Sequence, residues 1–245
     1  MPGILRAINA SSNDTLLDFG CGGRGYLTFE LARRSKKAIG LDTHPPRDPF
    51  IPPELFEKLE FVVAEGDRTE FPDDSFDAVL MSEVLLCIPE PERFLREVER
   101  IVKPGGRVVI VNTVDRLGIR EAYEKRMWLV RMMIKLGRAP STYEEYTDRL
   151  HLRFGNAIKS LPNIEYYKSL IERSGLALKQ KSYVWSSVVQ KHLDMLQFMF
   201  FCLGMKPFGR HFFLFYPYFW ILAKVLEWTR RERDAGSVIL VGEVQ

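Results

Sequence analysis

The chain has 245 residues, of which 46% are hydrophobic and 27% are charged. This composition is that of a globular protein and excludes wholesale disorder, collagen-like repeats and a coiled coil. The three cysteines Cys21, Cys87 and Cys202 are too scattered for a disulfide framework or a metal-ligand motif, so we expect a reducing, cytoplasmic setting and no metal. The first residues show no pattern of a secretory leader.

Charge is distributed unevenly along the chain. Residues 1–113 carry 14 Lys and Arg against 19 Asp and Glu, a net charge of −5, whereas the remaining residues have a net charge of +8. All four tryptophans lie in this basic second part. The asymmetry suggests that the two parts have different roles.

Residues 1–113 alternate short apolar runs with amphipathic stretches, which is typical of a parallel sheet covered on both faces. The predicted strands are residues 15–19, 37–42, 60–64, 76–82 and 107–112. The predicted helices between them are residues 26–35, 52–59 and 92–103, and the Lys-Pro-Gly-Gly run at 103–106 is predicted to end the last helix.

After residue 113 the pattern changes to longer helical stretches. Helices are predicted at residues 116–136, 142–154, 163–174, 186–203 and 212–233, and strands at 176–185 and 237–244. The expected organisation is a core over 1–113, a helical cap over 114–175, and two further core strands within 176–245. An aromatic-rich helical insertion is expected at about residues 186–235.

A glycine-rich loop lies between the first predicted strand and the first long helix. Gly20, Gly22 and Gly25 have the spacing GxGxxG, and Asp42 ends the next predicted strand. Glycine lets a ligand approach the backbone, and an acid about 20 residues later suits the hydroxyls of a ribose. The pattern predicts a nucleotide-type site without distinguishing cofactors, and a tight turn without ligand is the alternative.

Two further acids bear on which cofactor the loop would bind. Asp18 stands two residues before Gly20, where a carboxylate suits an ammonium group and repels a pyrophosphate. Asp67 follows Gly66 after the third predicted strand, at the edge where open α/β sheets bind ligands, and could accept an exocyclic amino group. These charges favour a zwitterionic ligand.

The motifs LLDFGCGG, AIGLD, VVAEGD and FPDDSFDAVLMSEVLLCIPEPERFLREVERIVKPGGRVVI together resemble a class I S-adenosylmethionine-dependent methyltransferase over residues 15–113. They are most similar to the small-molecule group that includes the ubiquinone/menaquinone-biosynthesis C-methyltransferases. The resemblance implies S-adenosyl-L-methionine as the cofactor. It also implies an α/β fold with a Rossmann-like, doubly wound, seven-stranded sheet, its last strand antiparallel, and helical cap insertions in the C-terminal half.

On this resemblance, the methionine part of the cofactor is expected beside Asp18, Gly20 and Gly22. Asp42 matches the ribose-binding acid and Asp67 the adenine-contacting acid. The other residues expected at the cofactor are Phe19, Gly25, Thr43, Gly66, Arg68, Ser82 and Glu83.

The loop departs from the family pattern in one place. Arg24 stands where the usual GxGxG has its third glycine, and Gly25 follows it. The region after the fourth strand also lacks the histidine pair found in many relatives, and reads Leu-Cys-Ile-Pro-Glu at 86–90.

Methyl transfer from a sulfonium is an in-line displacement, so alignment can supply most of the catalysis and no nucleophilic side chain is required. An acceptor hydroxyl or amine needs a base, and the candidates are Glu83, Asp115 and His151. Each also has an ordinary interpretation, for example Asp115 as a helix cap and His151 as an ordinary polar or half-buried residue.

The apolar stretch 196–228 contains the run FFLFYPYFWILA at 212–223. As a helix that run would be about 18 Å long, too short for a bilayer core of roughly 30 Å. It is interpreted as cap core, as the wall of a hydrophobic or aromatic acceptor pocket, or as a surface for peripheral membrane or homodimer contact.

The expected acceptor is a small, hydrophobic or aromatic molecule, and no nucleic acid is expected because the basic residues are spread along the helices rather than clustered. Four alternatives remain open: a nicotinamide-dependent oxidoreductase, a nucleic-acid methyltransferase, a non-catalytic adenosylmethionine-binding module, and an enzyme that transfers another part of the cofactor. Residues 82–85 lack the Asn/Asp-Pro-Pro-aromatic signature of the base-methylating enzymes.

Overall fold

A computed structural model describes residues 2–44, 46, 51–88, 90–114, 117–154, 162–183, 187–204 and 237–245. The chain forms two compact units. Unit 1 comprises Met1–Asn112, Asn163–Val184 and Val238–Gln245, and unit 2 comprises Thr113–Pro162 and Trp185–Ser237.

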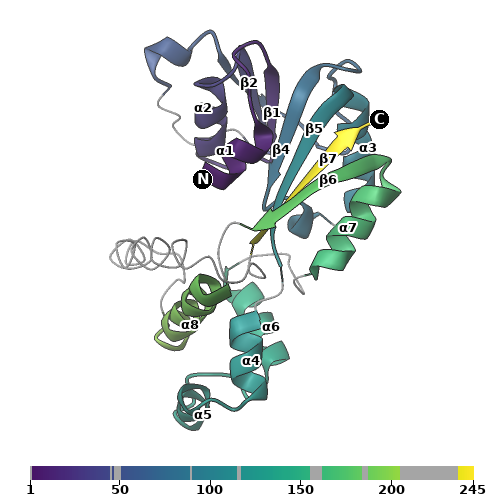
Figure 1. Ribbon diagram of the computed structural model, residues 1–245. Coiled ribbons are helices and arrows are strands. Elements are labelled where there is room, and N and C mark those ends of the chain that lie inside the picture. Colours follow the sequence, from purple (N-terminus) through teal and green to yellow (C-terminus); the bar gives the residue numbers. More distant parts are fainter. Residues whose placement is uncertain are drawn as a thin grey trace. The chain divides into compact units, whose positions relative to one another are not determined.

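Unit 1 contains a seven-stranded sheet with the order β3-β2-β1-β4-β5-β7-β6. The first five strands pair in parallel, and β6 and β7 pair antiparallel to each other. The strands are β1 Thr15–Phe19, β2 Lys37–Asp42, β3 Leu59–Val63, β4 Phe76–Ser82, β5 Val102–Thr113, β6 Leu176–Tyr183 and β7 Ser237–Val244. The predicted doubly wound, seven-stranded fold is therefore confirmed (Figure 1).

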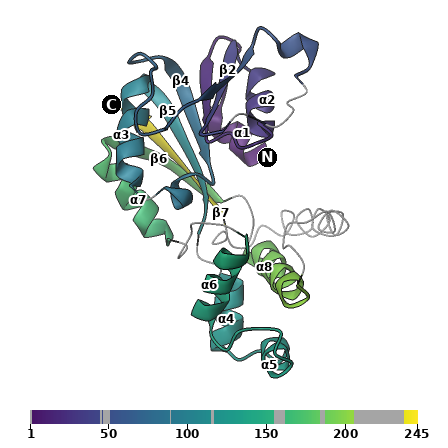
Figure 2. The ribbon, with the colours of Figure 1, turned by 180° about the vertical axis from the view of Figure 1, so that it is seen from behind.

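Helices cover both faces of this sheet, as the near-continuous apolar strands require. They are α1 Pro2–Ile8, α2 Tyr26–Ala32, η1 Pro53–Leu55, η2 Leu85–Cys87, α3 Pro91–Ile101 and α7 Ile164–Arg173. α1 and α2 pack with Leu16, Leu80 and Val109 on one face, and α3 and α7 lie on the opposite face (Figure 2). The sequence analysis did not predict α1.

The sequence predicted that the run at 103–106 would end the helix and precede the strand. This prediction is wrong, because the run lies within the strand. α3 ends at Ile101 and β5 begins at Val102. The pairing with β4 passes from Phe76↔Val102 to Ala78↔Arg107, so the residues between form an irregularity within the strand. Gly105 has φ 76°, a left-handed conformation that glycine adopts without strain.

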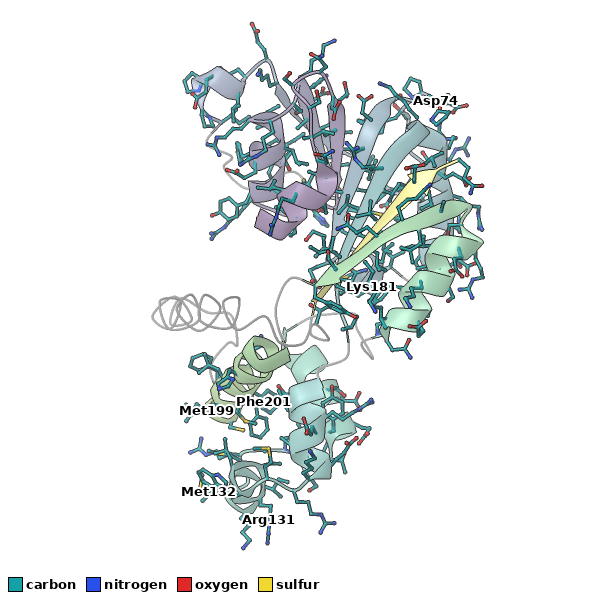
Figure 3. All side chains as sticks on the ribbon, viewed as in Figure 1. Asp74, Arg131, Met132, Lys181, Met199 and Phe201 are labelled. Atoms are coloured by element: carbon teal, nitrogen blue, oxygen red, sulfur yellow. The ribbon has the colours of Figure 1, made fainter. Side chains whose placement is uncertain are left out.

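Unit 2 is helical in its described part and has an aromatic core. Its helices are α4 Leu117–Glu124, α5 Trp128–Lys135, α6 Tyr143–Phe154 and α8 Ser187–Cys202. Phe201 of α8 packs edge-on against Tyr146 of α6, with 4.9 Å between ring centroids (Figure 3). The other buried members of this core are Ile119, Ala122, Val130, Ala139, Tyr143, Phe198 and Cys202.

The single helix predicted over 116–136 is wrong, because the chain breaks between α4 and α5. Arg126 has φ 46°, and the Met127 N–H donates to the Ala122 carbonyl at 2.9 Å. This left-handed residue ends α4, and the new direction of α5 lets Val130 reach the same core as Ala122.

Of the stretch 196–228, only residues 196–204 are described, and most of them are buried in unit 2. The run 212–223 and the helix predicted over 212–233 lie outside the described residues. Within the described part of the chain, no helix is both long and apolar enough to span a bilayer.

Candidate functional site

The glycine loop after β1 is closed onto the end of β2. The backbone N–H groups of Gly20 and Cys21 donate to the Leu41 carbonyl at 2.7 and 3.0 Å. The Gly22 N–H donates to Asp42 Oδ2 at 2.9 Å. The loop and the acid that the sequence singled out are thus in direct contact, at the carboxyl edge of two neighbouring parallel strands.

The glycines of the loop differ in the space around their Cα atoms. At Gly20, with φ 74°, an added Cβ would lie 2.5 Å from Cγ2 of Val84, so only glycine fits. At Gly22, with φ 69°, and at Gly23, an added Cβ would meet nothing within 4 Å. The loop therefore packs tightly on its β4 side and presents open backbone at its tip, which is the form of a cradle that a ligand can approach closely.

Asp42 presents its carboxylate in a fixed orientation. Oδ2 accepts from Gly22, and Oδ1 accepts from the Thr43 hydroxyl and the His44 N–H, both at 3.4 Å. These last two bonds are long, so Oδ1 retains capacity for a further donor. A carboxylate held in this way suits the paired hydroxyls of a ribose.

Asp18 is buried, with 1% of its surface exposed, and its Oδ2 accepts from the Thr28 hydroxyl at 2.6 Å. Burial raises the pKa of Asp18 to about 6, Thr28 opposes the shift, and Asp42 adds to it. Burial of the Cys21 thiol, followed by the nearby charges of Asp18 and Asp42, raises the pKa of this thiol to about 12, so Cys21 stays protonated. The sequence analysis missed Thr28, which lies one helical turn into α2.

After β3, Gly66 and Asp67 have different surroundings. An added Cβ at Gly66 would lie 2.3 Å from Cζ of Phe19, and the Phe19 and Phe94 rings meet edge-on. Oδ2 of Asp67 forms an ion pair with Nη2 of Arg93 at 2.9 Å. Among the described residues no other group pairs with this carboxylate, so its second oxygen could accept from a ligand, and Arg93 is a partner that the sequence analysis did not identify.

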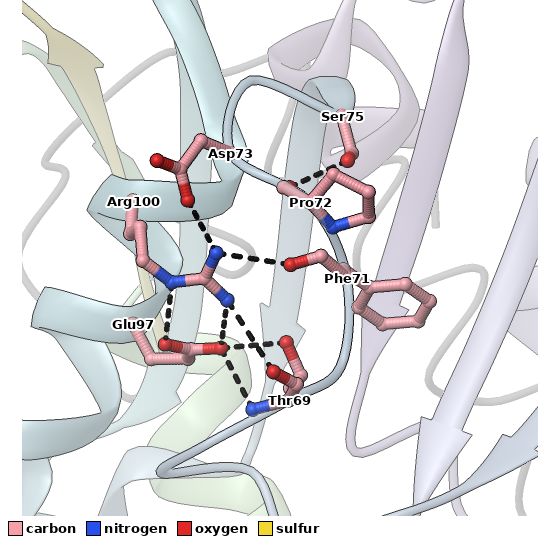
Figure 4. Close-up of polar contacts among 7 residues, drawn as sticks. All are labelled: Thr69, Phe71, Pro72, Asp73, Ser75, Glu97 and Arg100. Carbon is pink, nitrogen blue, oxygen red and sulfur yellow. Dashed lines mark hydrogen bonds and ion pairs between the residues drawn. The ribbon is translucent and has the colours of Figure 1, made fainter.

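The loop that follows Asp67 is anchored to α3 by a polar network (Figure 4). Oε1 of Glu97 accepts from the Thr69 N–H at 2.7 Å and from Nη2 of Arg100 at 2.6 Å. Nη1 of Arg100 donates to the Phe71 carbonyl at 2.9 Å and to Asp73. Burial disfavours the charge on Glu97, but the bonds from Arg100 and Thr69 outweigh it and hold its pKa below the ordinary value. The network fixes the loop that begins at the predicted adenine-contacting acid.

Glu83 follows β4 in a left-handed conformation that is uncommon for a residue with a side chain. Its φ is 60°, and its N–H donates to the Val111 carbonyl at 2.7 Å. Ser82, which precedes it, pairs with Val111 in the β4–β5 register. Strained backbone of this kind is enriched at functional sites, and it turns the chain abruptly at the carboxyl edge.

Two buried polar side chains lie in unit 1 without hydrogen-bond partners among the described residues. They are the Tyr167 hydroxyl on α7 and both amide atoms of Asn112 on β5. Burial raises the pKa of Tyr167, the charge of Glu83 is the next cause, and Tyr166 and Cys87 follow, so the Tyr167 hydroxyl lies within electrostatic range of Glu83. Unpaired buried polar atoms are costly and often occur at functional sites. The sequence analysis missed both residues.

The remaining predicted residues are distributed as follows. Gly25 precedes α2 as its N-cap, Thr43 bonds with His44 at 2.9 Å, and Arg68 is exposed. His151 lies within α6 of unit 2, where its side chain is not described, and Asp115 lies outside the described residues. Glu83 is thus the only one of the three candidate bases whose surroundings the described structure gives.

The glycine loop after β1, Asp42 at the end of β2 and Asp67 after β3 lie at the carboxyl edge of the unit 1 sheet, and we call them the cofactor rim. Their chemistry fits the cofactor that the sequence motifs implied. Open glycine backbone at the loop tip, a fixed carboxylate at the end of β2 and a carboxylate held on one side after β3 are groups that could hold the amino-acid, ribose and adenine parts of S-adenosyl-L-methionine. Comparison with known proteins agrees with this. The family model described as "Methyltransferase domain" matches residues 17–110.

Two curated relatives illustrate the likeness. The demethylmenaquinone methyltransferase of Clavibacter sepedonicus is 31% identical over 158 residues, which is 63% of this chain and 58% of that protein. The ubiquinone/menaquinone biosynthesis C-methyltransferase UbiE of Hahella chejuensis is 28% identical over 139 residues, 56% of this chain and 53% of that protein. The matched part thus spans little more than half the length of these relatives.

Among solved structures, the geranyl diphosphate C-methyltransferase from Streptomyces coelicolor A3(2) superposes with a TM-score of 0.61 at 13% identity, over 100% of this chain and 74% of that one. At this identity the likeness shows the fold alone. That protein was solved with S-adenosyl-L-homocysteine. From its motifs, its sheet and these matches, the chain is similar to the class I S-adenosylmethionine-dependent methyltransferases and, among them, to the ubiquinone/menaquinone-biosynthesis group, and S-adenosyl-L-methionine is the cofactor that this likeness supports.

Proposed function

We propose that this chain transfers a methyl group from S-adenosyl-L-methionine, by in-line displacement, to a small hydrophobic or aromatic acceptor in the cytoplasm. The observation that carries the proposal is the contact between Gly22 and Asp42, 2.9 Å between N and Oδ2, because it joins the open loop tip to an oriented acid. A turn without a ligand would not need a carboxylate held beside open backbone.

In this proposal each part of the rim binds one part of the cofactor. Oδ1 of Asp42 accepts from the ribose hydroxyls, since only long bonds occupy it. Asp67, held by Arg93, accepts the adenine amino group. Gly22 and Gly23 admit the amino-acid part to within backbone contact, and the negative charge of Asp18 favours its ammonium group. Phe19, Gly25, Thr43, Gly66, Arg68 and Ser82 stay predicted members of this site.

When bound, the sulfonium supplies the methyl group, and the electron pair of the broken C–S bond stays on sulfur. The chain's contribution is alignment and exclusion of water, which can lower the barrier by about 7 kcal/mol or more. The acceptor atom loses a proton, and we assign that proton to the Glu83 carboxylate, which follows β4 at the ligand-binding edge. Asp115 and His151 are the alternative bases.

The apolar character of the acceptor is inferred from three observations. The relatives' names refer to quinone precursors and geranyl diphosphate. Unit 2 has an aromatic core built around Tyr123, Tyr146 and Phe198. The described surface offers no acidic cluster for a metal-bridged phosphate, since no group of three candidate metal ligands occurs among the described residues.

Cofactor binding can be tested by calorimetry with S-adenosyl-L-methionine, S-adenosyl-L-homocysteine and NAD. We expect the first two to bind and NAD not to bind. Asp42→Ala should weaken cofactor binding on the order of 30-fold, because a ribose hydroxyl loses a charged partner. Glu57→Ala, at an exposed acid of the same unit, is the matched control and should bind as the parent does. Equal affinity of Asp42→Ala and parent would remove Asp42 from the site.

Turnover requires a separate measurement, because a binding module would pass the first test. Transfer of a labelled methyl group should be measured to phenolic or quinol acceptors with and without an isoprenoid tail. We expect faster transfer to the tailed acceptor. Tight cofactor binding with no product from either acceptor would favour a non-catalytic module, and transfer of another part of the cofactor would appear as a product without the methyl label.

A further inference from the structure

Helix α5 of unit 2 exposes an apolar stripe. Trp128, Met132 and Leu136 follow one another at i, i+4 and i+8, and their exposed fractions are 71%, 37% and 63%. Val130, on the inner side of the same helix, is 1% exposed and belongs to the unit 2 core. In Figure 3, Met132 projects outward from the helix. Single exposed apolar side chains are common on protein surfaces, but three large ones in line on one helix indicate a contact surface.

Cations border this stripe. Arg131 and Lys135 are exposed and lie within about 60° of Trp128 around the helix axis. Arg126 and Arg138 are exposed at the two ends of the helix. None of these four cations has an ion-pair partner among the described residues. Residues 125–138 contain five Lys and Arg and no acid. We call Trp128, Met132, Leu136, Arg131 and Lys135 together the α5 face.

From this combination we propose that the α5 face docks unit 2 on an anionic lipid surface. The apolar stripe enters the boundary between headgroups and acyl chains, and the bordering cations contact the lipid phosphates, as in interfacial amphipathic helices. The stripe is about 12 Å long, so the helix lies in the plane of the membrane surface. This surface is separate from the stretch 196–228 that the sequence analysis considered for membrane contact.

The chemistry of the α5 face favours lipid over two other partners. A second copy docked through the same face would bring Arg131 and Lys135 of both chains together, since a two-fold contact repeats its residues. A nucleic acid would pair with the cations but leave Met132 and Leu136 without an apolar partner. An anionic bilayer offers acyl chains to the apolar stripe and phosphates to the bordering cations. The inference uses only unit 2 and does not depend on the proposed methyl transfer.

The experiment is vesicle flotation of the full chain with three lipid compositions. These are phosphatidylcholine alone, phosphatidylcholine with a quarter phosphatidylglycerol, and the latter in 1 M NaCl. We expect binding to the anionic vesicles, little binding to the neutral ones, and a large loss in high salt. The double variant Arg131→Glu/Lys135→Glu should lower the partition coefficient at least 25-fold, at about fivefold for each cation removed. Trp128→Ser should lower it about tenfold.

Matched variants in unit 1 control for general effects of charge and exposed apolar area. Lys36→Glu/Lys58→Glu reverses two exposed cations, and Phe56→Ser removes a side chain that is 62% exposed. Both should float as the parent does. All variants should have the circular dichroism spectrum and the thermal unfolding midpoint of the parent, because each replaced side chain is exposed, and this shows that they fold.

Three results would overturn the inference. One is equal flotation of parent and α5-face variants. Another is absence of binding to anionic vesicles at low salt, and a salt-sensitive shift with RNA in that case would identify a nucleic acid instead. The third is a concentration-dependent dimer that Trp128→Ser abolishes while vesicle binding is unchanged, which would assign the face to a second copy. Loss of cofactor binding in the parent would refute the proposed function and leave this test intact.

Discussion

Units 1 and 2 use their polar side chains differently. In unit 1, several acids and cations far apart in the sequence are joined, as Asp73 is to Arg100 and as Asp77 is to Lys103 at 2.6 Å. In unit 2, the described ion pairs are exposed and lie one helical turn apart, as for Arg149 and Glu145. Distant pairs fix loops at the sheet edge, whereas pairs within one helix fix little beyond that helix.

Two tyrosine hydroxyls, one in each unit, also differ in their partners. Tyr123 on α4 in unit 2 donates to the Pro140 carbonyl at 3.2 Å and so ties this helix to the segment before α6. Tyr167 in unit 1 has no partner among the described residues and lies within range of Glu83. The Tyr123 hydroxyl therefore stabilises packing within unit 2, whereas the Tyr167 hydroxyl has no such role among the described residues of unit 1.

The largest effect is expected from breaking the network around Glu97. Glu97→Ala removes the acceptor for Thr69 and Arg100, so we expect the free energy of unfolding to fall by about 3 kcal/mol. The matched change in unit 2 is Arg149→Ala, which breaks an exposed pair and should leave the unfolding midpoint nearly unchanged. The free energies of unfolding of both variants are measured by chemical denaturation and compared with that of the parent. Equal losses in the two units would contradict the contrast drawn above.

The next effect concerns glycines with the same backbone conformation but different neighbours. Gly20→Ala should destabilise the protein by about 2 kcal/mol or more, because it adds left-handed strain and a Cβ that would lie 2.5 Å from Val84. Gly137 in unit 2 has φ 66° and nothing within 4 Å, so Gly137→Ala should cost about 1 kcal/mol from strain alone. Thermal unfolding measures both. Equal losses in the two variants would mean that the Val84 contact relaxes freely.

Cofactor affinity should depend on pH through Asp18, whose pKa is raised to about 6. Because the folded pKa lies above the ordinary value of 3.8, the folded form binds the proton more readily, and this group adds stability as pH falls from 6 toward 4. The cofactor's ammonium favours the ionised form, so its dissociation constant should rise about tenfold per pH unit below 6. Titration calorimetry at pH 5, 6 and 7 tests this.

Asp18→Asn is the control for the pH series. It removes the titrating group while retaining the shape of the side chain, so its affinity should be weaker at pH 7 and should vary less between pH 5 and 7. If the variant kept the full pH dependence of the parent, another group would be responsible.

The smallest effects are expected at the two tyrosines, and they should have opposite signs. Tyr123→Phe loses a hydrogen bond and should destabilise the protein by about 1 kcal/mol. Tyr167→Phe removes a buried hydroxyl with no partner among the described residues, so its stability should be unchanged or slightly higher. If Tyr167 supports Glu83 in the reaction, the Tyr167→Phe variant should also show a shifted pH profile of kcat with an unchanged affinity for the cofactor. Destabilisation of both variants alike would show that Tyr167 has a structural partner.

Much of unit 1 could be predicted from the sequence, because its signals are local. β1, β2, β4 and β7 have the predicted bounds, since each is a short apolar run between turn residues. The glycine loop and Asp42 could be predicted as neighbours because parallel strands place their carboxyl ends at one edge. The helix over 116–136 could not be predicted correctly, since its periodicity is continuous and only packing of Ala122 and Val130 on one core requires the break at Arg126.

The sequence by itself thus determined the succession of strands along the chain, the glycine turn, and the acids at the carboxyl edge of the sheet. These features depend on residues close together in the chain or on the fixed geometry of parallel sheets. Only the tertiary structure decided which distant groups meet them. Arg93 approaches Asp67 from the next helix, Thr28 contacts Asp18, and Tyr167 comes within range of Glu83 from a helix 84 positions later. No periodicity encodes such meetings, since they arise when helices fold back over the sheet and bury polar atoms together.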